Sequence, residues 1–248
     1  MNKFFHVFFC ICLALAATLH GSRDNLYFLE ENHIKDVLLT TLRDCTTGCA
    51  AFQEASNQIG YLLAYKVCNF IPTKQKTVYT LTGAAFKQGE VFKKNPILVS
   101  VMRGGLSLLS AFQSIFKGAP VGMIGHKRNE ENALPMLYYL NLPKIEYDDK
   151  VVVLEPMLAT GGSLSMTIAL LKQAGASEEN IIIATVIAAP QGVERLFSEY
   201  PGINIILASL DPCLNEKFYI VPGLGDFGDR YFGNDSEPHF AVMTDLHN

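Results

Sequence analysis

The stretch VVVLEPMLATGGSLSMTIALLKQAG, from Val151 to Gly175, constrains the fold more than any other part of the chain. Its apolar, β-branched run Val151–Leu154 is typical of a short strand that is buried on both faces of a sheet. Glu155 ends this run, and Pro156 is expected to stop the hydrogen-bonded ladder. Small residues follow, and then apolar residues at helical spacing lead to a glycine suited to a helix C-terminus. The stretch predicts a strand, a glycine-rich turn and a helix.

The predicted turn has the properties of a phosphate site. The first N–H groups of a helix are unpaired and carry partial positive charge, so they attract an anion. Gly161 and Gly162 would let the backbone approach it, and the hydroxyls of Thr160 and Ser163 could donate further hydrogen bonds. Glu155, at the end of the strand, could accept hydrogen bonds from two ribose hydroxyls. An ordinary glycine-rich turn remains the alternative.

Two common phosphate loops do not match this segment. A Walker loop ends in Gly-Lys-Ser/Thr, and residues 155–163 contain no lysine. The GxGxxG spacing of dinucleotide-binding folds is also absent there.

Strands and helices alternate through the middle of the chain. Apolar runs predict strands at 97–101, 121–124, 151–154, 181–189 and 203–210, and helices at 106–116 and 192–199 besides the one after the turn. This alternation predicts an α/β fold with a parallel central sheet flanked by helices. Before it, Ile34, Val37, Leu38 and Leu42 mark one amphipathic helix, residues 52–63 mark another, and residues 79–89 suggest a short strand pair or arm.

Basic residues follow two of the predicted strands. Arg103 heads the turn after the strand at 97–101, so it should share the carboxyl rim of the sheet with Glu155, where ligands of open α/β sheets bind. A guanidinium at that rim can hold a pyrophosphate bidentately. The strand at 121–124 leads to His126, Lys127 and Arg128. By pattern alone, this second basic run is better interpreted as a solvated surface segment.

A segment near the C-terminus, residues 218–230, contains many glycines and prolines within an apolar frame. It predicts a structured loop rather than a regular helix or a central strand, because proline and glycine interrupt both. A plain turn is the alternative to a binding loop.

The first residues differ from the rest of the chain. Residues 1–21 contain Lys3 followed by an apolar run that is typical of a signal-peptide core, and Ala14-Leu15-Ala16 offers a cleavage pattern. Residues 22–248 are expected to form a single domain. A net charge of −4 gives no reason to expect nucleic-acid binding. Secretory or membrane-associated targeting is one interpretation of residues 1–21, and a non-targeting extension is the other.

Five motifs in order resemble those of the uracil phosphoribosyltransferase family. EPMLATGGS at 155–163 resembles its loop for phosphoribosyl diphosphate (PRPP), which usually begins with Asp. VMRGGL at 101–106 and HKRNEEN at 126–132 resemble its two arginine loops. IAAPQGVERLFSEYP at 187–201 and LNEKFYIVPGLGDFGDRYFG at 214–233 resemble the following strand and helix and the uracil loop. The resemblance spans residues 32–234 and implies a type I phosphoribosyltransferase fold, with a hood formed by the N- and C-terminal segments and a β-arm at Pro135–Leu142.

The resemblance also implies residue roles. The expected PRPP-binding residues are Arg103, Arg128, Glu155, Pro156, Met157, Leu158, Ala159, Thr160, Gly161, Gly162, Ser163 and Asp226. The expected uracil-binding residues are Tyr219, Ile220, Gly225, Asp226 and Phe227, with Tyr219 and Phe227 as apolar walls. The expected catalytic residues are Asp226, Arg103 and Arg128. Bacterial relatives usually have Gly where Phe218 stands.

The implied reaction converts uracil and PRPP to uridine monophosphate (UMP) and pyrophosphate, with Mg²⁺ held through PRPP and water rather than by the protein. A homodimer or homotetramer, a GTP effector and a cytoplasmic location are further expectations from the family. The alternative is a non-catalytic PRPP or nucleotide sensor that retains the fold. Such a relative would be expected to lose several of the charged residues, and among the charged ligands only the Glu155 position departs from the family pattern.

Overall fold

The computed structural model describes residues 24–128 and 135–234, with the side chains of residues 127, 128 and 135 left aside. Its central sheet has the strand order β1-β10-β9-β7-β4-β5-β6, and β8 pairs with β9. The strands are β1 (Leu26–Phe28), β4 (Ile97–Met102), β5 (Val121–Arg128), β6 (Pro135–Asn141), β7 (Val151–Leu154), β8 (Met157–Leu158), β9 (Ile181–Ala188) and β10 (Asn204–Leu210). β5 and β6 are antiparallel, and the other pairs are parallel. The predicted α/β fold with a parallel central sheet is confirmed.

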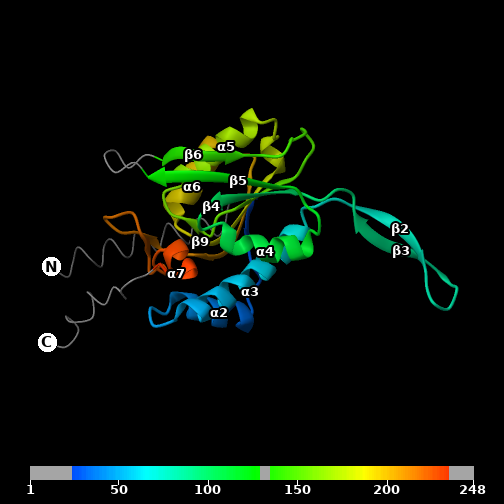
Figure 1. The fold of residues 1–248 in the computed structure, drawn as a ribbon, viewed down its shortest axis with the longest axis horizontal. Helices are drawn as coiled ribbons and strands as arrows, with labels where there is room; N and C mark the ends of the chain where they lie inside the picture. The colour runs from blue at the N-terminus through cyan, green and yellow to red at the C-terminus, as the bar shows by residue number, and fades with distance from the viewer. Residues whose placement is uncertain (1–23, 129–134, 235–248) are drawn as a thin grey trace.

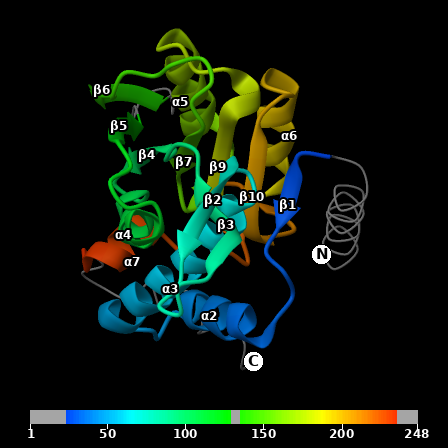
Figure 2. The same cartoon turned by 90° about the vertical axis from the view of Figure 1, so that its right-hand side faces the viewer.

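Helices cover both faces of this sheet (Figures 1 and 2). One face carries α2 (His33–Arg43), α3 (Cys49–Cys68) and α4 (Leu106–Ile115), and the other carries α5 (Gly162–Gln173) and α6 (Pro190–Glu199). Successive residues of a strand point to opposite faces, so Val152 and Leu154 pack with α2–α4 while Val151 and Val153 pack with α5 and α6. This two-sided burial explains why the central strands are continuous apolar runs.

The first helix forms as predicted, but its buried face is different. Ile34 and Val37, which helped to mark the helix, are 63% and 64% exposed. The buried positions are Lys35, Leu38, Leu39 and Leu42. These four residues follow the i, i+3, i+4, i+7 spacing of a single stripe, and the Lys35 ammonium leaves the core to pair with Glu31.

A hairpin of β2 (Thr73–Tyr79) and β3 (Ala85–Phe92) projects away from the body of the molecule (Figure 1). The strand pair suggested for residues 79–89 is therefore present, although it is longer. The β-arm expected at Pro135–Leu142 is wrong, because Pro135–Asn141 is β6, the antiparallel edge strand of the central sheet.

None of the helices in the described ranges has the length and hydropathy needed to cross a bilayer. The signal-like segment at residues 1–21 lies outside the described residues.

Candidate active site

The order of the strands fixes where the functional residues meet. β4 is followed along the chain by its neighbour β5, whereas β7, on the other side of β4, is followed by β8, β9 and β10. The connections therefore diverge between β4 and β7, and such a switch point opens a crevice at the carboxyl ends of the strands. The loop from Arg103 to Gly105 follows β4, and Glu155 follows β7. The predicted juxtaposition of Arg103 and Glu155 at one rim is confirmed at the level of the backbone.

The β4–α4 loop lies directly against the end of β7. A Cβ atom at Gly105 would lie 2.1 Å from the carbonyl oxygen of Leu154, and one at Gly104 would lie 3.5 Å from Oε1 of Glu155. The first of these distances requires glycine at position 105, because a real Cβ atom does not come so near to a backbone oxygen. The two loops consequently share one wall of the crevice.

The segment at residues 159–163, named here the phosphate loop, has the geometry of an anion site. α5 begins at Gly162 after Gly161, which adopts the left-handed conformation (φ 78°). The first turn of α5 contains no acidic residue, and no side chain caps it. A hollow of about 150 Å³ lies at this point. Its lining residues are Glu155, Met157, Leu158, Ala159, Thr160, Gly161, Gly162, Ser163 and Leu164. The predicted strand, turn and helix are confirmed.

One expectation for residues 156–158 needs correction. Pro156 does not end the ladder, because β8 pairs with β9 immediately after it and the Pro156 carbonyl accepts hydrogen bonds from the N–H groups of Val186 and Ile187. A proline lacks only the donor, so its carbonyl still takes part. The side chains of Pro156 and Leu158 are buried, and these residues can reach a ligand in the hollow only through their backbone.

Arg103 is held by an acidic residue that the sequence did not indicate. Its guanidinium donates to a carboxylate oxygen of Asp229 at 2.6 Å, and both side chains are partly exposed. Asp229 lies in the short helix α7 (Phe227–Phe232), and Asp226 caps this helix by accepting the N–H of Asp229. Arg103 is thus poised at the opening of the crevice, where an anionic ligand could replace the carboxylate.

Glu155 lies in an environment that disfavours its charge. Burial raises the pKa of Glu155 to about 8, the N–H of Met157 opposes this shift, and the negative charge of Asp226 adds to it. The carboxyl group therefore keeps its proton at neutral pH while no ligand is bound. A ligand that donates hydrogen bonds to this group, or brings positive charge, would favour the carboxylate.

The C-terminal loop is organised by an asparagine. β11 (Cys213–Leu214) and β12 (Ile220–Val221) are antiparallel, and the side-chain oxygen of Asn215 accepts hydrogen bonds from the N–H groups of Lys217 and Tyr219 at the tip between them. Phe218 has φ 63°, a conformation that favours glycine. This explains in physical terms why glycine suits the position. The predicted structured loop is confirmed, although a helical turn, α7, ends it.

Phe227 does not form the expected apolar wall of a base pocket. Its side chain is 2% exposed and packs against Phe52 of α3, with ring centroids 5.0 Å apart. Tyr219, by contrast, is 55% exposed, and Ile220 is buried. Only the backbone of Phe227, at the start of α7, could take part in binding.

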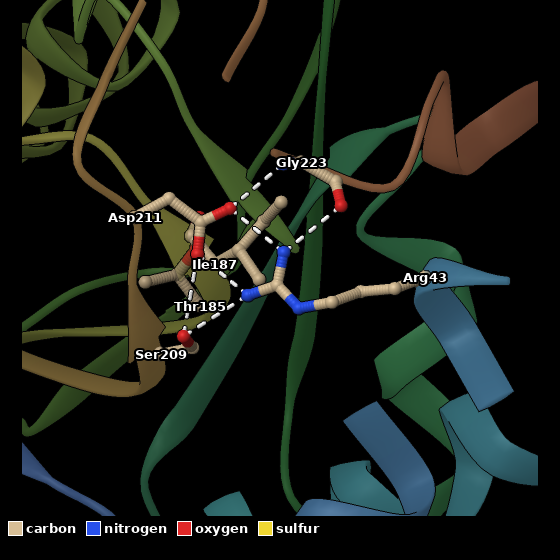
Figure 3. A network of polar contacts seen from close by, with 6 residues as sticks. All are labelled: Arg43, Thr185, Ile187, Ser209, Asp211 and Gly223. Carbon is tan, nitrogen blue, oxygen red and sulfur yellow. Dashed lines mark hydrogen bonds and ion pairs between the residues drawn. The ribbon is translucent and has the colours of Figure 1, made fainter. Parts of the chain in front are cut away.

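A buried ion pair joins α2 to the C-terminal loop (Figure 3). The guanidinium of Arg43 donates to both carboxylate oxygens of Asp211, which is 2% exposed, and to the carbonyl of Gly223 at 2.9 Å. The same carboxylate accepts the N–H of Gly223, and Ser209 completes the network. Arg43 therefore fixes α2 to the loop that follows β10.

Arg230 makes a second connection between these elements. Its guanidinium donates to the carbonyls of Leu42 and Asp44 at the end of α2 and to the carbonyl of Leu224, and it lies over the ring of Phe52. A cation at a helix C-terminus satisfies unpaired carbonyls and opposes the negative end of the dipole. The N-terminal helices and the C-terminal loop therefore form one unit, as expected for the hood.

Arg128 occupies the last position of β5, but its side chain lies outside the described part of the structure. Asp229, Asp211 and Asn215 escaped the analysis of the sequence. The spacing of Asp226 and Asp229, which is that of an N-cap and its third residue, was the one signal that could have found Asp229.

Comparisons with known proteins agree with this geometry. The adenine phosphoribosyl transferase from Trypanosoma brucei, solved in complex with AMP, pyrophosphate and ribose-5-phosphate, has a TM-score of 0.54 at 11% identity over 82% of this chain and 88% of that one. That likeness is one of fold, and it places the chain among proteins with the phosphoribosyltransferase fold. The AQ2163 protein from Aquifex aeolicus has a TM-score of 0.74 at 32% identity, covering 84% of this chain and 97% of its own.

Sequence comparison narrows the class. The family model described as uracil phosphoribosyltransferase matches residues 29–234. A uracil phosphoribosyltransferase from Limosilactobacillus reuteri (strain DSM 20016) is 39% identical over 195 residues, which are 79% of this chain and 92% of the relative. One from Dictyostelium discoideum is 36% identical over 212 residues, 86% of this chain and 98% of the relative. The chain belongs to the uracil phosphoribosyltransferase family.

Removal of the Asp211 charge should destabilise the fold. In Asp211→Asn, the guanidinium of Arg43 would remain partly buried with no carboxylate, which should lower the free energy of unfolding by about 2–4 kcal/mol. Urea unfolding of the variant and the parent measures this difference. Asp148→Asn, at an exposed carboxylate, is the control and should change stability little. A loss at Asp211 no larger than that of the control would show that the pair does not hold the hood.

The pKa of Glu155 predicts a pH-dependent stability. Its ordinary value is 4.5, so between about pH 4.5 and 8 the unfolded chain releases a proton that the folded chain keeps. Rising pH therefore favours unfolding across this window, and the effect is complete above pH 8. Glu155→Gln removes this pH dependence. The thermal midpoint of the variant, taken relative to that of the parent, should therefore be higher at pH 8 than at pH 5.5 by roughly a few degrees.

Thermal unfolding of the ligand-free proteins at the two pH values gives this difference directly. Glu90→Gln, at an exposed position of β3, is the matched control and should show no such increase. A difference for Glu155→Gln that is constant with pH would mean that this carboxyl group is ionised in the empty crevice.

Proposed function

We propose that this chain is a uracil phosphoribosyltransferase that converts uracil and PRPP to UMP and pyrophosphate. The observation that carries this proposal is the meeting of four features at one switch point: the phosphate loop, Glu155, Arg103 and the cap of α7 at Asp226. The names of the relatives, which align over most of this chain, support the same reaction.

PRPP would bind in the crevice in the following orientation. The 5′-phosphate would bind the N-terminus of α5, where Gly161 and Gly162 admit it and the hydroxyls of Thr160 and Ser163 are exposed. The ribose 2′- and 3′-hydroxyls would donate to Glu155, which would give up its proton as they bind. The pyrophosphate would then lie toward Arg103, and Arg128 at the end of β5 would be its second cation.

Catalysis in this arrangement is a matter of position and charge. The N1 atom of uracil would attack the anomeric carbon as the bond to pyrophosphate breaks, negative charge would grow on the leaving group, and the N1 proton would be released to solvent. Arg103 and Arg128 would neutralise that charge, and the fixed loops would hold the reacting atoms in line. Asp226 would contact PRPP or its hydrated metal.

Mg²⁺ would be bound through the oxygens of PRPP and through water, and it would neutralise the pyrophosphate as a Lewis acid. The donor set fits that use. Glu155 and Asp226 are oxygen donors, and burial together with the negative charge of Asp226 disfavours the ionised form of Glu155, so nearby positive charge would favour its carboxylate. Among the described residues, no cluster of three or more His, Cys, Asp or Glu side chains is placed to hold a metal alone.

Uracil would be recognised by backbone groups of the C-terminal loop. The carbonyl and N–H groups of Ile220 and of residues 225–227 would pair with the edge that carries O2, N3 and O4. Cytosine would leave some of those groups buried and unpaired, which costs free energy. The side chain of Tyr219 is exposed and could form an apolar wall, whereas the ring of Phe227 is buried and could not.

The reaction is tested with labelled uracil, PRPP and Mg²⁺ and the purified chain. UMP should form, and both Arg103→Ala and Arg128→Ala should lower kcat/KM on the order of a hundredfold, or about 2.7 kcal/mol each. The double variant should lose less than the sum, because both groups address one pyrophosphate. Lys117→Ala is the control, because Lys117 is exposed and lies before the amino end of β5, away from the carboxyl ends of the strands. Absence of UMP with the parent chain would refute the proposal.

We also propose that the β2–β3 hairpin joins two copies of the chain as a homodimer. Each residue of β2 is exposed, and the hairpin presents Val78, Leu81 and Phe86 to solvent, although an isolated two-stranded hairpin is barely stable in water. A second copy of the chain would cover these side chains. Light scattering should give twice the chain mass for the parent and the chain mass for Val78→Asp/Phe86→Asp. Lys87→Asp, on the same strand, is the control, and dimers of the double variant would contradict the role of the arm.

A further inference from the structure

His126 points into the molecule, although by pattern its basic run was interpreted as a solvated surface segment. In β5, Ile124 packs with Leu164 and Ile168 of α5, and His126 follows two residues later on the same face. Its Nε2 atom lies 2.9 Å from the hydroxyl oxygen of Thr167 in α5. The strand that ends at Arg128 is therefore tied by a side-chain hydrogen bond to the helix that begins at the phosphate loop.

An irregularity in the sheet accompanies this contact. Gly125 pairs with Tyr139, but His126 pairs with Leu137, so Tyr138 is an extra residue opposite β5. A Cβ atom at Gly125 would lie 2.5 Å from the ring of Tyr138, which shows that the ring covers Gly125 on the opposite side from α5. Bulges of this kind redirect side chains, and they are common beside functional sites.

The hydrogen bond between His126 and Thr167 requires polar groups to be buried, which costs free energy. Its contribution to stability does not explain why the pair is present. Thr167 is fully buried, and burial lowers the pKa of His126, so the imidazole is neutral at neutral pH. Within the described ranges, the Nδ1 atom of this ring is buried and has no hydrogen-bond partner. An apolar pair of the same shape would carry no such penalty. The pair is therefore better explained by what it positions than by the stability it adds.

The position of Thr167 on α5 shows which parts of the site the pair positions. Thr167 lies one helical turn after Ser163 of the phosphate loop, and the other buried residues of α5 are apolar. Apolar contacts are non-directional, so they allow a helix to rotate or slide slightly, whereas a hydrogen bond fixes its register. The strand end and the helix N-terminus are the two elements proposed to hold the pyrophosphate and the 5′-phosphate of one molecule.

We propose that His126 is a positioning residue for PRPP, which fixes the phosphate-binding end of α5 relative to the end of β5 through its hydrogen bond to Thr167. This inference rests on the proposed function, because it takes the phosphate loop as the 5′-phosphate site.

The test uses the double variant His126→Leu/Thr167→Val, which removes both partners without leaving either one unpaired. Its thermal midpoint should stay close to that of the parent, while the KM for PRPP should rise roughly fivefold to tenfold, the equivalent of one lost hydrogen bond. The KM for uracil should change much less. His126→Gln, which can place a donor nitrogen near the same point, and Thr167→Ser should both keep the parental KM for PRPP.

Thr185→Val is the matched control, since Thr185 is also fully buried but its hydroxyl bonds within its own strand, β9. Calorimetric titration of PRPP with Mg²⁺ gives a second readout that does not require turnover of uracil. Weaker PRPP binding in the double variant alone supports the inference, even if the parent forms no UMP. An unchanged PRPP affinity in the double variant overturns it, and so does an equal loss in Thr185→Val.

Discussion

The parallel pairing of β4 with β7 is the interaction on which the site depends. Ile97 pairs with Val151 and Ser100 with Leu154, so the two strands end at one edge and their loops must share the space beyond it. The register is held by burial on both faces, because a slip of one residue would exchange the side chains that face α2–α4 with those that face α5 and α6. Glycine at position 105 then allows the β4 loop to lie against the end of β7. An arginine, a carboxyl group and a helix N-terminus meet as a consequence of sheet geometry.

Charge in the crevice is balanced only in part. Burial and the negative charge of Asp226 disfavour the ionised form of Glu155, and Asp229 is paired with the guanidinium of Arg103. Each of these arrangements is improved by a ligand that brings hydroxyl donors, phosphate oxygens and a hydrated cation together. The empty site is therefore electrostatically suited to a charged sugar phosphate rather than to an apolar molecule, in keeping with catalysis by preorganised groups.

The backbone of this site could be predicted from the sequence, and much of its side-chain chemistry could not. Apolar runs and glycine positions were enough for the strand, turn and helix at 151–175, because these patterns are local and each has a simple physical cause. Phe227 was misjudged because a pattern of loop residues does not say which aromatic ring packs onto a distant helix such as α3. The partners of Arg43 and Arg103 were missed for the same reason, since each lies more than a hundred residues away. The contact of His126 with Thr167 was also missed, because the two residues lie 41 positions apart in the chain.

The ion pair between Arg43 and Asp211 also bears on how the protein is made. Its two residues are separated by 168 positions, so at ordinary rates of synthesis Asp211 leaves the ribosome on the order of ten to thirty seconds after Arg43. During that interval α2 and α3 have been synthesised, but the loop that covers their ends has not. The parallel strands and the phosphate loop are complete earlier along the chain than the loop that contains Ile220. A nascent chain can therefore assemble the half of the crevice that suits a sugar phosphate before the half that suits a base exists.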